Sequence, residues 1–247
     1  GPAPLQPGQI RDSNRPTLLA LVAQAGFEPV DLGRVADDEP AIAGAIERGA
    51  VTCDAVLSSG GVSMGDIDLV RVVLDRIGDM RWMQVAIRPA KPLAFGLVPG
   101  PAGRPVPVFG LPGNPVSSMV SFALFARAGL RRLAGHPDAR LHLPRFRAVA
   151  AEPLARRPDG KVHFVRVVAT VTPVGGPGLS GRGSASGAVG AGGELRVRSS
   201  GGQGSHQLGA MARADGLAVL PDGEGVGAGE PVEVILLAEP PTAASPS

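Results

Sequence analysis

The stretch "DAVLSSGGVSMGDIDLVRVVLDRIG", residues 54–78, decides the fold expected for the first half of this 247-residue chain. Its opening run, "DAVLSS", is short and apolar, as is typical of a buried strand. Its closing run repeats apolar side chains at the spacing of one helix face: Ile67, Val70, Val73, Leu74 and Ile77. A strand, a glycine-rich turn and a helix in this order predict one repeat of an α/β sheet, with the turn at the carboxyl end of the strand.

The segments on either side continue the alternation of strands and helices. Helices are expected for residues 14–26, 37–50, 66–78 and 114–135, and strands for residues 27–35, 54–59, 83–87 and 105–110. Asn14 is a plausible N-cap of the first helix. This alternation predicts a mostly parallel sheet covered by helices on both faces. We therefore expect an α/β domain over residues 1–137.

The second half of the chain has a different texture. From residue 138 onward the sequence contains short β-prone runs between Gly-, Pro- and Asp-rich turns, and no convincing helical pattern. This predicts a small all-β sandwich or barrel over residues 138–247. The low-complexity segment 175–193 is expected to be a flexible loop, and the final "PPTAASPS" a disordered tail.

Composition excludes several classes of protein. The net charge is +2 and no dense basic run occurs, which argues against a nucleic-acid partner. The single cysteine, Cys53, excludes an internal disulfide framework and a cysteine-based zinc site. No apolar run approaches the ~20 residues of a membrane span, and the first residues carry no secretory signal. A cytoplasmic protein with no membrane partner is the simplest expectation.

The glycine loop after residue 59 is the first candidate for chemistry. Gly60 and Gly61 allow positive φ and close backbone approach, and the free N–H groups at the start of the next helix favour an anion. Asp66 and Asp68 would suit this loop if a divalent cation bridged them to a phosphate, or if a carboxylate accepted from N–H groups of a heterocycle. Alternatively, Asp66 caps the helix and Asp68 is a first-turn acid favoured by the helix dipole.

Three further loops carry candidate residues. In "FGLPGNPVSS", residues 109–118, prolines stiffen a second turn between a strand and a helix. In "IRPAKPLAFG", residues 87–96, Arg88 and Lys91 leave a strand end, and Lys91 is one of only two lysines in an arginine-dominated chain. Such a choice indicates a site that prefers a compact ammonium. In "SSGGQGSH", residues 199–206, glycines and Ser205 present N–H and hydroxyl groups, whereas the lone His206 indicates a structural polar residue.

Taken together, five stretches resemble the molybdopterin molybdenumtransferase family, that is, the MoeA-like proteins and the E domain of gephyrin. They are "GQIRDSN", "SSGGVSMGDID", "IRPAKPLAFG", "FGLPGNPVS" and "GGQGSH", in the family's order. The resemblance implies a MogA-like α/β/α molybdopterin-binding domain followed by a barrel-like β domain. It also implies insertion of molybdate into adenylylated molybdopterin with release of AMP, and a magnesium cofactor. A homodimer of the full-length parent and a MogA-like adenylyltransferase partner are implied as well.

The same resemblance assigns roles to individual residues. The catalytic residues would be Asp37, Asp68 and Lys91, and the metal ligands Asp66 and Asp68. The substrate-binding residues would be Ser59, Gly60, Gly61, Ser63, Gly65, Arg88, Pro112, Gly113, Asn114, Pro115 and Ser205. Under this assignment the glycine loop holds the pterin or phosphate end of the substrate, and the acids bind metal or pterin N–H groups.

The chain also departs from the family pattern. Gln84 stands where some members have a lysine, and Ala90 replaces the glycine of "PGKP". The family's "TGDEL" motif and its two N-terminal domains do not precede "PGQIRDSN" here. Two functions therefore compete: the transferase, completed by another segment or polypeptide, and a pterin-binding or scaffold module without turnover of its own.

Overall fold

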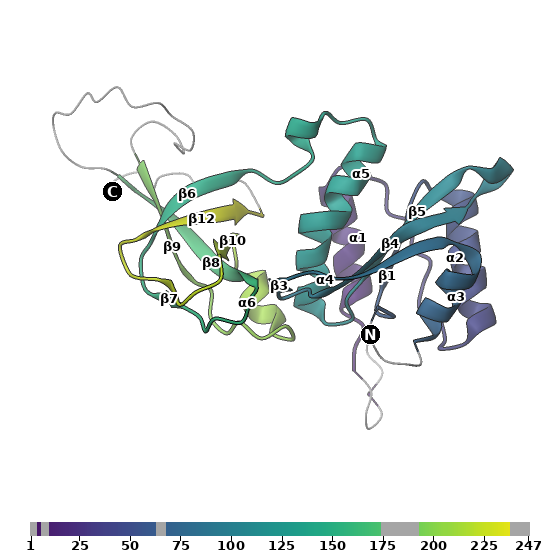
Figure 1. Cartoon of the computed structure of the whole chain (residues 1–247), viewed down its shortest axis with the longest axis horizontal. Helices are drawn as coiled ribbons and strands as arrows, with labels where there is room; N and C mark the ends of the chain where they lie inside the picture. Colours follow the sequence, from purple (N-terminus) through teal and green to yellow (C-terminus); the bar gives the residue numbers. More distant parts are fainter. Residues whose placement is uncertain (1–3, 6–9, 63–67, 174–192, 238–247) are drawn as a thin grey trace. The chain divides into compact units, whose positions relative to one another are not determined.

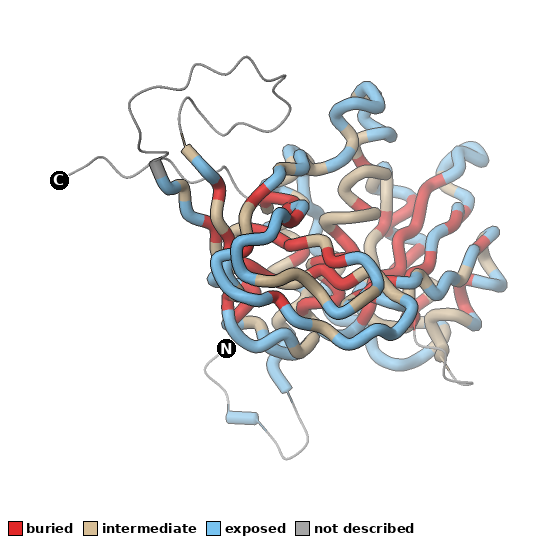
Figure 2. Tube along the Cα trace, turned by 60° about the vertical axis from the view of Figure 1, so that its left-hand side comes forward, coloured by how far each residue is buried: buried red, intermediate tan, exposed pale blue. Residues whose placement is uncertain are grey.

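The computed structural model describes residues 4–5, 10–62, 68–173 and 193–237. The chain divides into two units, which are treated separately below. Unit 1 comprises Gly1–Val85 and Ala90–Pro137, and unit 2 comprises Ala86–Pro89 and Asp138–Ser247. In Figure 2 the buried residues, drawn in red, follow the strands, whereas most connecting segments are exposed.

Unit 1 is built on a four-stranded sheet with the order β1-β5-β4-β2. The strands are β1 (Val56–Ser59), β2 (Asp79–Gln84), β4 (Pro92–Pro99) and β5 (Pro105–Leu111). β1 runs parallel to β5, but β4 is antiparallel to both of its neighbours. The expectation of a mostly parallel sheet is therefore wrong. β4 and β5 form a hairpin closed by the short turn Pro101–Gly103, and a short turn can join only antiparallel strands.

Helices cover both faces of this sheet (Figure 1). One layer holds α1 (Asn14–Gln24), α4 (Pro115–Ser121) and α5 (Arg127–Leu133), with a π-helical turn, Phe122–Ala126, joining the last two. Its core includes Leu18, Phe109 and Phe122. The opposite layer holds α2 (Glu39–Thr52) and α3 (Leu69–Ile77), whose core includes Val73 and Leu74. The α/β/α arrangement predicted for this region is confirmed.

The predicted strand of residues 27–35 does not form, and the one predicted for residues 83–87 is divided between β2 and the short strand Ile87–Arg88 of unit 2. Residues 27–35 are assigned to no strand, although their sequence is β-prone. In the described part of the chain, β1 pairs with β5 on one side only, and residues 27–35 line a cavity beside it instead of pairing with it. The N–H of Gly33 bonds to the side chain of Asp31 at 2.8 Å. A strand needs hydrogen-bond partners for its backbone groups. Here the N–H of Gly33 finds its partner in a side chain and not in a neighbouring strand.

Unit 2 contains a closed β barrel. Its sheet has the order β10-β12-β6-β9-β8-β3, and an additional pairing between β10 and β8 closes the ring. The strands are β3 (Ile87–Arg88), β6 (Arg145–Ala150), β8 (Val162–Pro173), β9 (Gly193–Ser199), β10 (Gly216–Leu220) and β12 (Pro231–Leu236). Two short strands, β7 (Leu154–Ala155) and β11 (Gly225–Val226), pair separately. The predicted barrel-like domain is confirmed.

Unit 2 also contains short helical pieces that the sequence did not predict. They are α6 (Leu208–Ala212) and the 3₁₀ turn Asp138–Arg140. The predicted flexible loop lies outside the described residues except for Gly193, which begins β9, and the predicted tail lies wholly outside them. Within the described residues, no helix combines the length and apolarity needed to cross a membrane.

Candidate functional site

The candidate site of unit 1 lies at the carboxyl ends of β1 and β5. Because these strands are parallel, their following loops meet at one edge of the sheet. One loop contains Gly60 and Gly61, and the other contains Pro112 and Gly113. The N–H of Gly60 donates to the carbonyl of Leu111 at 2.9 Å, which extends the ladder between the strands into the loops.

Two of the predicted glycines are required by the backbone. Gly60 and Gly61 have φ values of 96° and 74°, in the left-handed region that favours glycine. A Cβ on Gly61 would also lie 2.3 Å from Cγ2 of Val70 on α3. The loop therefore packs directly against the first turn of the helix that follows it, with no room for a side chain.

Asn14 connects the end of β1, where the glycine loop starts, to the loop after β5. Its Nδ2 donates to Oγ of Ser59 and to the carbonyl of Gly113, each at 2.7 Å. The prediction that Asn14 caps α1 is wrong, because Ser13 occupies the N-cap position and Asn14 is the first helical residue. The side chain is drawn into the site by acceptors that the loops supply.

The acids near the glycine loop have different roles from those expected. Asp68, not Asp66, is the N-cap of α3, and its carboxylate accepts from the N–H of Val70 at 3.2 Å. Asp66 therefore does not cap this helix. Ser63, Gly65 and Asp66 lie outside the described residues. The expected metal and substrate roles of these acids stay predictions.

A cavity of about 1370 Å³ opens beside β1, between α1 and α2. Asp37, Ser59 at the end of β1, and the glycine-loop residues Gly60 and Gly61 line it. Asp37 is exposed, and its neighbour Asp38 caps α2 by accepting from the N–H of Ala41 at 3.0 Å. The structure thus brings Asp37 and the glycine loop to one cavity.

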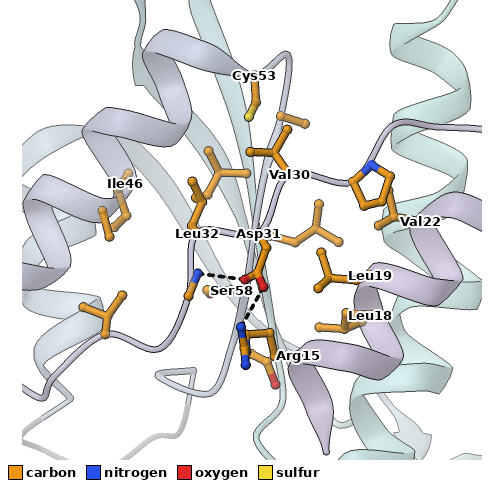
Figure 3. Close-up of a pocket in the computed structure, with 18 of the residues that line it drawn as sticks. Arg15, Leu18, Leu19, Val22, Val30, Asp31, Leu32, Ile46, Cys53 and Ser58 are labelled. Carbon is orange, nitrogen blue, oxygen red and sulfur yellow. Dashed lines mark hydrogen bonds and ion pairs between the residues drawn. The ribbon is translucent and has the colours of Figure 1, made fainter. Parts of the chain in front are cut away.

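An ion pair spans this cavity (Figure 3). Nη1 of Arg15, on α1, lies 2.6 Å from Oδ2 of Asp31, in the extended segment between the helices. The hydrogen bond from Gly33 N–H, together with Arg15, lowers the pKa of Asp31. Apolar side chains of α1 and α2, including Leu18, Val22 and Ile46, face the same space.

The remaining unit 1 residues form the rim of the second loop and a separate turn. Pro112 is buried, whereas Gly113 and Asn114 are exposed. Asn114 occupies the N-cap position of α4 without a side-chain capping bond, and Pro115 follows at the first helical position. Lys91 is exposed, and its backbone carbonyl accepts from the N–H of Val85 at 2.8 Å.

Arg88 lies in unit 2, in β3, and not in the unit that contains Lys91. Nη1 of Arg88 is 4.0 Å from Oδ2 of Asp159. The pKa of Asp159 is lowered to about 2, chiefly by the hydrogen bond from Lys161, and His163 Nε2 lies 3.0 Å from the same carboxylate. Arg88 therefore faces an acid whose charge persists at neutral pH.

A second arginine of unit 2, Arg166, is fully buried in β8. Its Nη2 donates to the carbonyls of Gly202 at 2.7 Å and Gly204 at 3.2 Å, while the side chain of Gln203 bonds to both backbone groups of Arg166. Its Nε and Nη1 are buried and have no partner in the described part of the chain. Desolvation lowers the pKa of this guanidinium. Ser205 follows directly in sequence after Gly204, whose carbonyl Arg166 binds.

The candidate residues described above do not form a complete magnesium site. Within the described ranges, no three His, Cys, Asp or Glu side chains gather closely enough to hold a metal ion. Asp68 contributes its carboxylate to a helix cap, and Asp66 lies outside those ranges. The described donors alone therefore do not fit a magnesium ion.

Two family models match the chain. A probable molybdopterin binding domain matches residues 4–132, and the MoeA C-terminal region (domain IV) matches residues 182–237. The chain belongs to the MoeA-like molybdopterin molybdenumtransferase family. The first match covers most of unit 1, including Asn14 and both loops that it connects.

Individual relatives agree with this assignment. The molybdopterin molybdenumtransferase of Haemophilus influenzae is 32% identical over 232 residues, which are 94% of this chain and 51% of that protein. The corresponding enzyme of Nostoc sp. is 44% identical over 134 residues, 53% of this chain and 30% of that protein. The crystal structure of a molybdopterin biosynthesis moea protein from Pyrococcus horikosii superimposes with a TM-score of 0.67 at 26% identity, covering 95% of this chain and 50% of that one. The chain thus spans about half the length, or less, of the relatives that it matches.

For this MoeA-like chain, sequence reasoning missed two site residues. Asn14 was interpreted as a cap, which is the commonest reason for an asparagine at a helix start. Arg166 carried a signal that could have been found, because it interrupts the apolar run "FVRVVATV" of a strand that must be buried. A charged residue in such a position is rare unless it binds something.

Proposed function

We propose that this chain supplies the substrate-binding and anion-binding parts of a molybdopterin molybdenumtransferase. The reaction inserts molybdate into adenylylated molybdopterin. The pterin's dithiolene sulfurs replace oxygens of molybdate, which take up protons and leave as water. A water molecule hydrolyses the phosphoanhydride, which releases AMP and leaves the terminal phosphate on the pterin. The observation that carries the proposal is the pair of loops after β1 and β5, joined by Asn14 at one sheet edge. This edge is the usual ligand position in such folds.

The two loops suit the pterin and phosphate part of the substrate. Gly60 and Gly61 have no side chains, so their N–H groups can approach phosphate oxygens closely. The cavity beside them is large and mostly apolar in its walls, with Asp37 at its lining. A carboxylate there can accept from the N–H groups of a pterin ring. Asp37 and Asp68 are the acids proposed to act on this substrate.

The basic residues suit molybdate and the substrate's phosphates. Lys91 is an exposed point charge, and Arg88 is an exposed guanidinium in unit 2. Arg166 adds buried N–H donors that lack acceptors within the described part of unit 2. Donors removed from water bind an oxyanion more strongly than exposed ones do. No step of the proposal is assigned to magnesium, because Asp66 lies outside the described residues and the described side chains alone do not form a complete site.

A binding or scaffold function is the second candidate. It is favoured by one observation, namely that the chain spans about half the length of its relatives. In that case the loops would hold pterin without turnover. The homodimer, the MogA-like adenylyltransferase that would supply the adenylylated substrate, and a cytoplasmic location remain part of the proposal for the complete protein.

An insertion assay on the complete protein separates the two candidates. It would contain adenylylated molybdopterin, molybdate and magnesium, with AMP release as the readout. Asp68→Ala should abolish AMP release while the circular dichroism spectrum stays unchanged. Asp79→Ala is the matched control, because Asp79 is exposed and pairs only with the neighbouring Arg81 at 2.9 Å. Wild-type AMP release by Asp68→Ala would remove Asp68 from the mechanism, and pterin binding without AMP release by the wild type would favour the scaffold.

A further inference from the structure

We infer that Asn14 is a positioning residue that couples the two loops of the candidate site, so that a ligand bound at one loop also orders the other. The inference rests on the proposed function for the identity of the ligand. It does not assign Asn14 a contact with substrate. It assigns the residue the task of holding the loop after β1 against the loop after β5.

The orientation of the Asn14 amide is determined by its surroundings. The carbonyl of Gly113 can only accept a hydrogen bond, so the group that faces it must be the NH₂ end. The second N–H of that group donates to Oγ of Ser59. Both donors of the amide are therefore used within the protein, and none is left for an oxyanion.

The arrangement of Asn14 leaves buried polar atoms without hydrogen bonds, which indicates that it does more than stabilise the fold. Oδ1 of Asn14 is buried and has no partner in the described part of the chain, and the same holds for Oγ of Ser58 in the adjoining strand end. Buried acceptors without donors are rare in folded proteins and destabilise them. Asn14 nevertheless lies where its two donors reach Gly113, in the loop after β5, and Ser59, at the end of β1, which are 99 and 45 residues away in sequence.

Among the described residues of the two loops, one further hydrogen bond joins them at the strand ends. The N–H of Gly60 bonds to the carbonyl of Leu111, where the ladder finishes. Past that point, a Cβ on Gly113 would lie 3.6 Å from Cα of Gly60, which is ordinary packing distance. Packing alone permits sliding, whereas the two hydrogen bonds of one rigid amide hold Gly113, in the loop after β5, against Ser59, the strand residue from which the glycine loop starts. Asn14 thus supplies the directional part of the connection.

Two substitutions separate the two bonds. Asn14→Ala removes both. Asn14→Asp keeps the size of the side chain but cannot donate, so the bond to the Gly113 carbonyl is lost, whereas the Ser59 hydroxyl can turn and donate to the carboxylate. Ser13→Ala is the matched control, because Ser13 precedes Asn14 and makes no side-chain capping bond.

Hydrogen exchange followed by mass spectrometry tests the coupling in the 247-residue chain. In the free protein, Asn14→Ala should speed exchange in peptides covering residues 58–62 and 110–114, whereas Asn14→Asp should speed it mainly in 110–114. With AMP and molybdate as probes, ligand protection in the wild type should extend over both peptides. In Asn14→Ala it should be confined to one of them, and the AMP dissociation constant should rise ~10-fold or more.

The outcomes are distinguishable from those that test the proposed function. If the wild type binds neither probe, the proposed function fails for this chain, and the free-state exchange pattern still decides the role of Asn14. Equal exchange in both loops of wild type and Asn14→Ala would overturn the inference. So would equal ligand protection of both loops in Asn14→Ala, because a merely structural residue would change the exchange rates without uncoupling the loops.

Discussion

The two units solve the problem of strand edges differently. In unit 2, the pairing of β10 with both β12 and β8 closes the sheet on itself, so the barrel strands find partners within the unit. In unit 1, β1 and β2 end the sheet, and β1 borders a cavity of about 1370 Å³. A closed barrel satisfies its own backbone groups, whereas an open sheet depends on what covers its edge. The candidate glycine loop follows that open edge.

The open edge of β1 in unit 1 predicts the largest effect, which is on the transferase activity. The 247 residues by themselves should give no AMP release in the insertion assay, because in the described part of the chain no strand pairs with the free side of β1, which leads into the glycine loop. Activity should appear when a polypeptide containing "TGDEL" is supplied, either fused to these residues or as a second chain. The assay uses adenylylated molybdopterin, magnesium and molybdate. Substantial AMP release by the isolated chain would show that the open edge of β1 does not limit function.

The second expected effect is on local stability. Amides of β8 and β10 should exchange only by global unfolding of the barrel, because both strands have partners on either side. Amides of residues 27–36 should exchange with little protection, since they belong to no strand and most of these residues are exposed. Native-state hydrogen exchange should separate the two groups by several kcal/mol, within the range of ~5–15 kcal/mol typical of whole domains. Equal protection would mean that the segment is held as firmly as a barrel strand.

Part of this difference could be predicted from the sequence. The rest could not, and the reasons are physical. The strand and helix of residues 54–78 were predictable because their periodicity is local. Residues 27–35 have the same β-prone composition, but whether they form a strand depends on a partner far away in sequence. The strand β4 was not predicted, because the turn at residues 100–104 was not recognised as the turn of a hairpin. Asn14 was misinterpreted because the partners of its hydrogen bonds lie 45 and 99 residues away in sequence.

The third prediction concerns Arg166, whose replacement should change both the free energy of unfolding and the affinity for molybdate. Arg166→Met replaces a buried cation that has unpartnered N–H groups by an apolar side chain of similar length. The substitution also removes the donor of the Gly202 and Gly204 carbonyls, so the free energy of unfolding should fall by ~1–3 kcal/mol. Molybdate affinity, measured by titration calorimetry, should fall ~10-fold or more, since charge-assisted donors are lost. Arg198→Met, at an exposed position of β9, is the control. Unchanged affinity in Arg166→Met would exclude Arg166 as an anion ligand.

The fourth prediction is a pH dependence confined to unit 2. Burial lowers the pKa of His163 below 6.5, and the positive charges of Arg156 and Arg88 act in the same direction, while Asp159 opposes them. Between the folded pKa and 6.5 the unfolded chain binds more protons than the folded one, so the stability from this group is complete above pH 6.5 and is lost as pH falls below it.

His163→Gln should flatten this part of the stability profile, measured by chemical denaturation monitored on unit 2 peptides. The loss attributed to Asp159 should appear separately and at lower pH, as the solution passes from pH 3.8 to about 2. A wild-type profile that stays level from pH 7 to 5 would contradict the expected role of His163.

The smallest effect is expected at Ala90, where the chain returns from unit 2 to unit 1. Ala90 has a φ of 75°, in the left-handed region, and it replaces the glycine found there in the family's motif. Ala90→Gly should relieve backbone strain of ~1–2 kcal/mol. It should also lose a buried methyl group worth ~0.8 kcal/mol, because Ala90 is only 3% exposed, and it should increase the unfolded chain's entropy by ~0.4–1 kcal/mol. These terms nearly cancel, so thermal unfolding should shift by no more than a few degrees. Ala90→Val, which adds a β-branched side chain at the same φ and in the same buried space, should destabilise the protein clearly more. If Ala90→Val were as stable as Ala90→Gly, the turn before Lys91 would adopt another backbone conformation, and the departure from the family's glycine would need a different explanation.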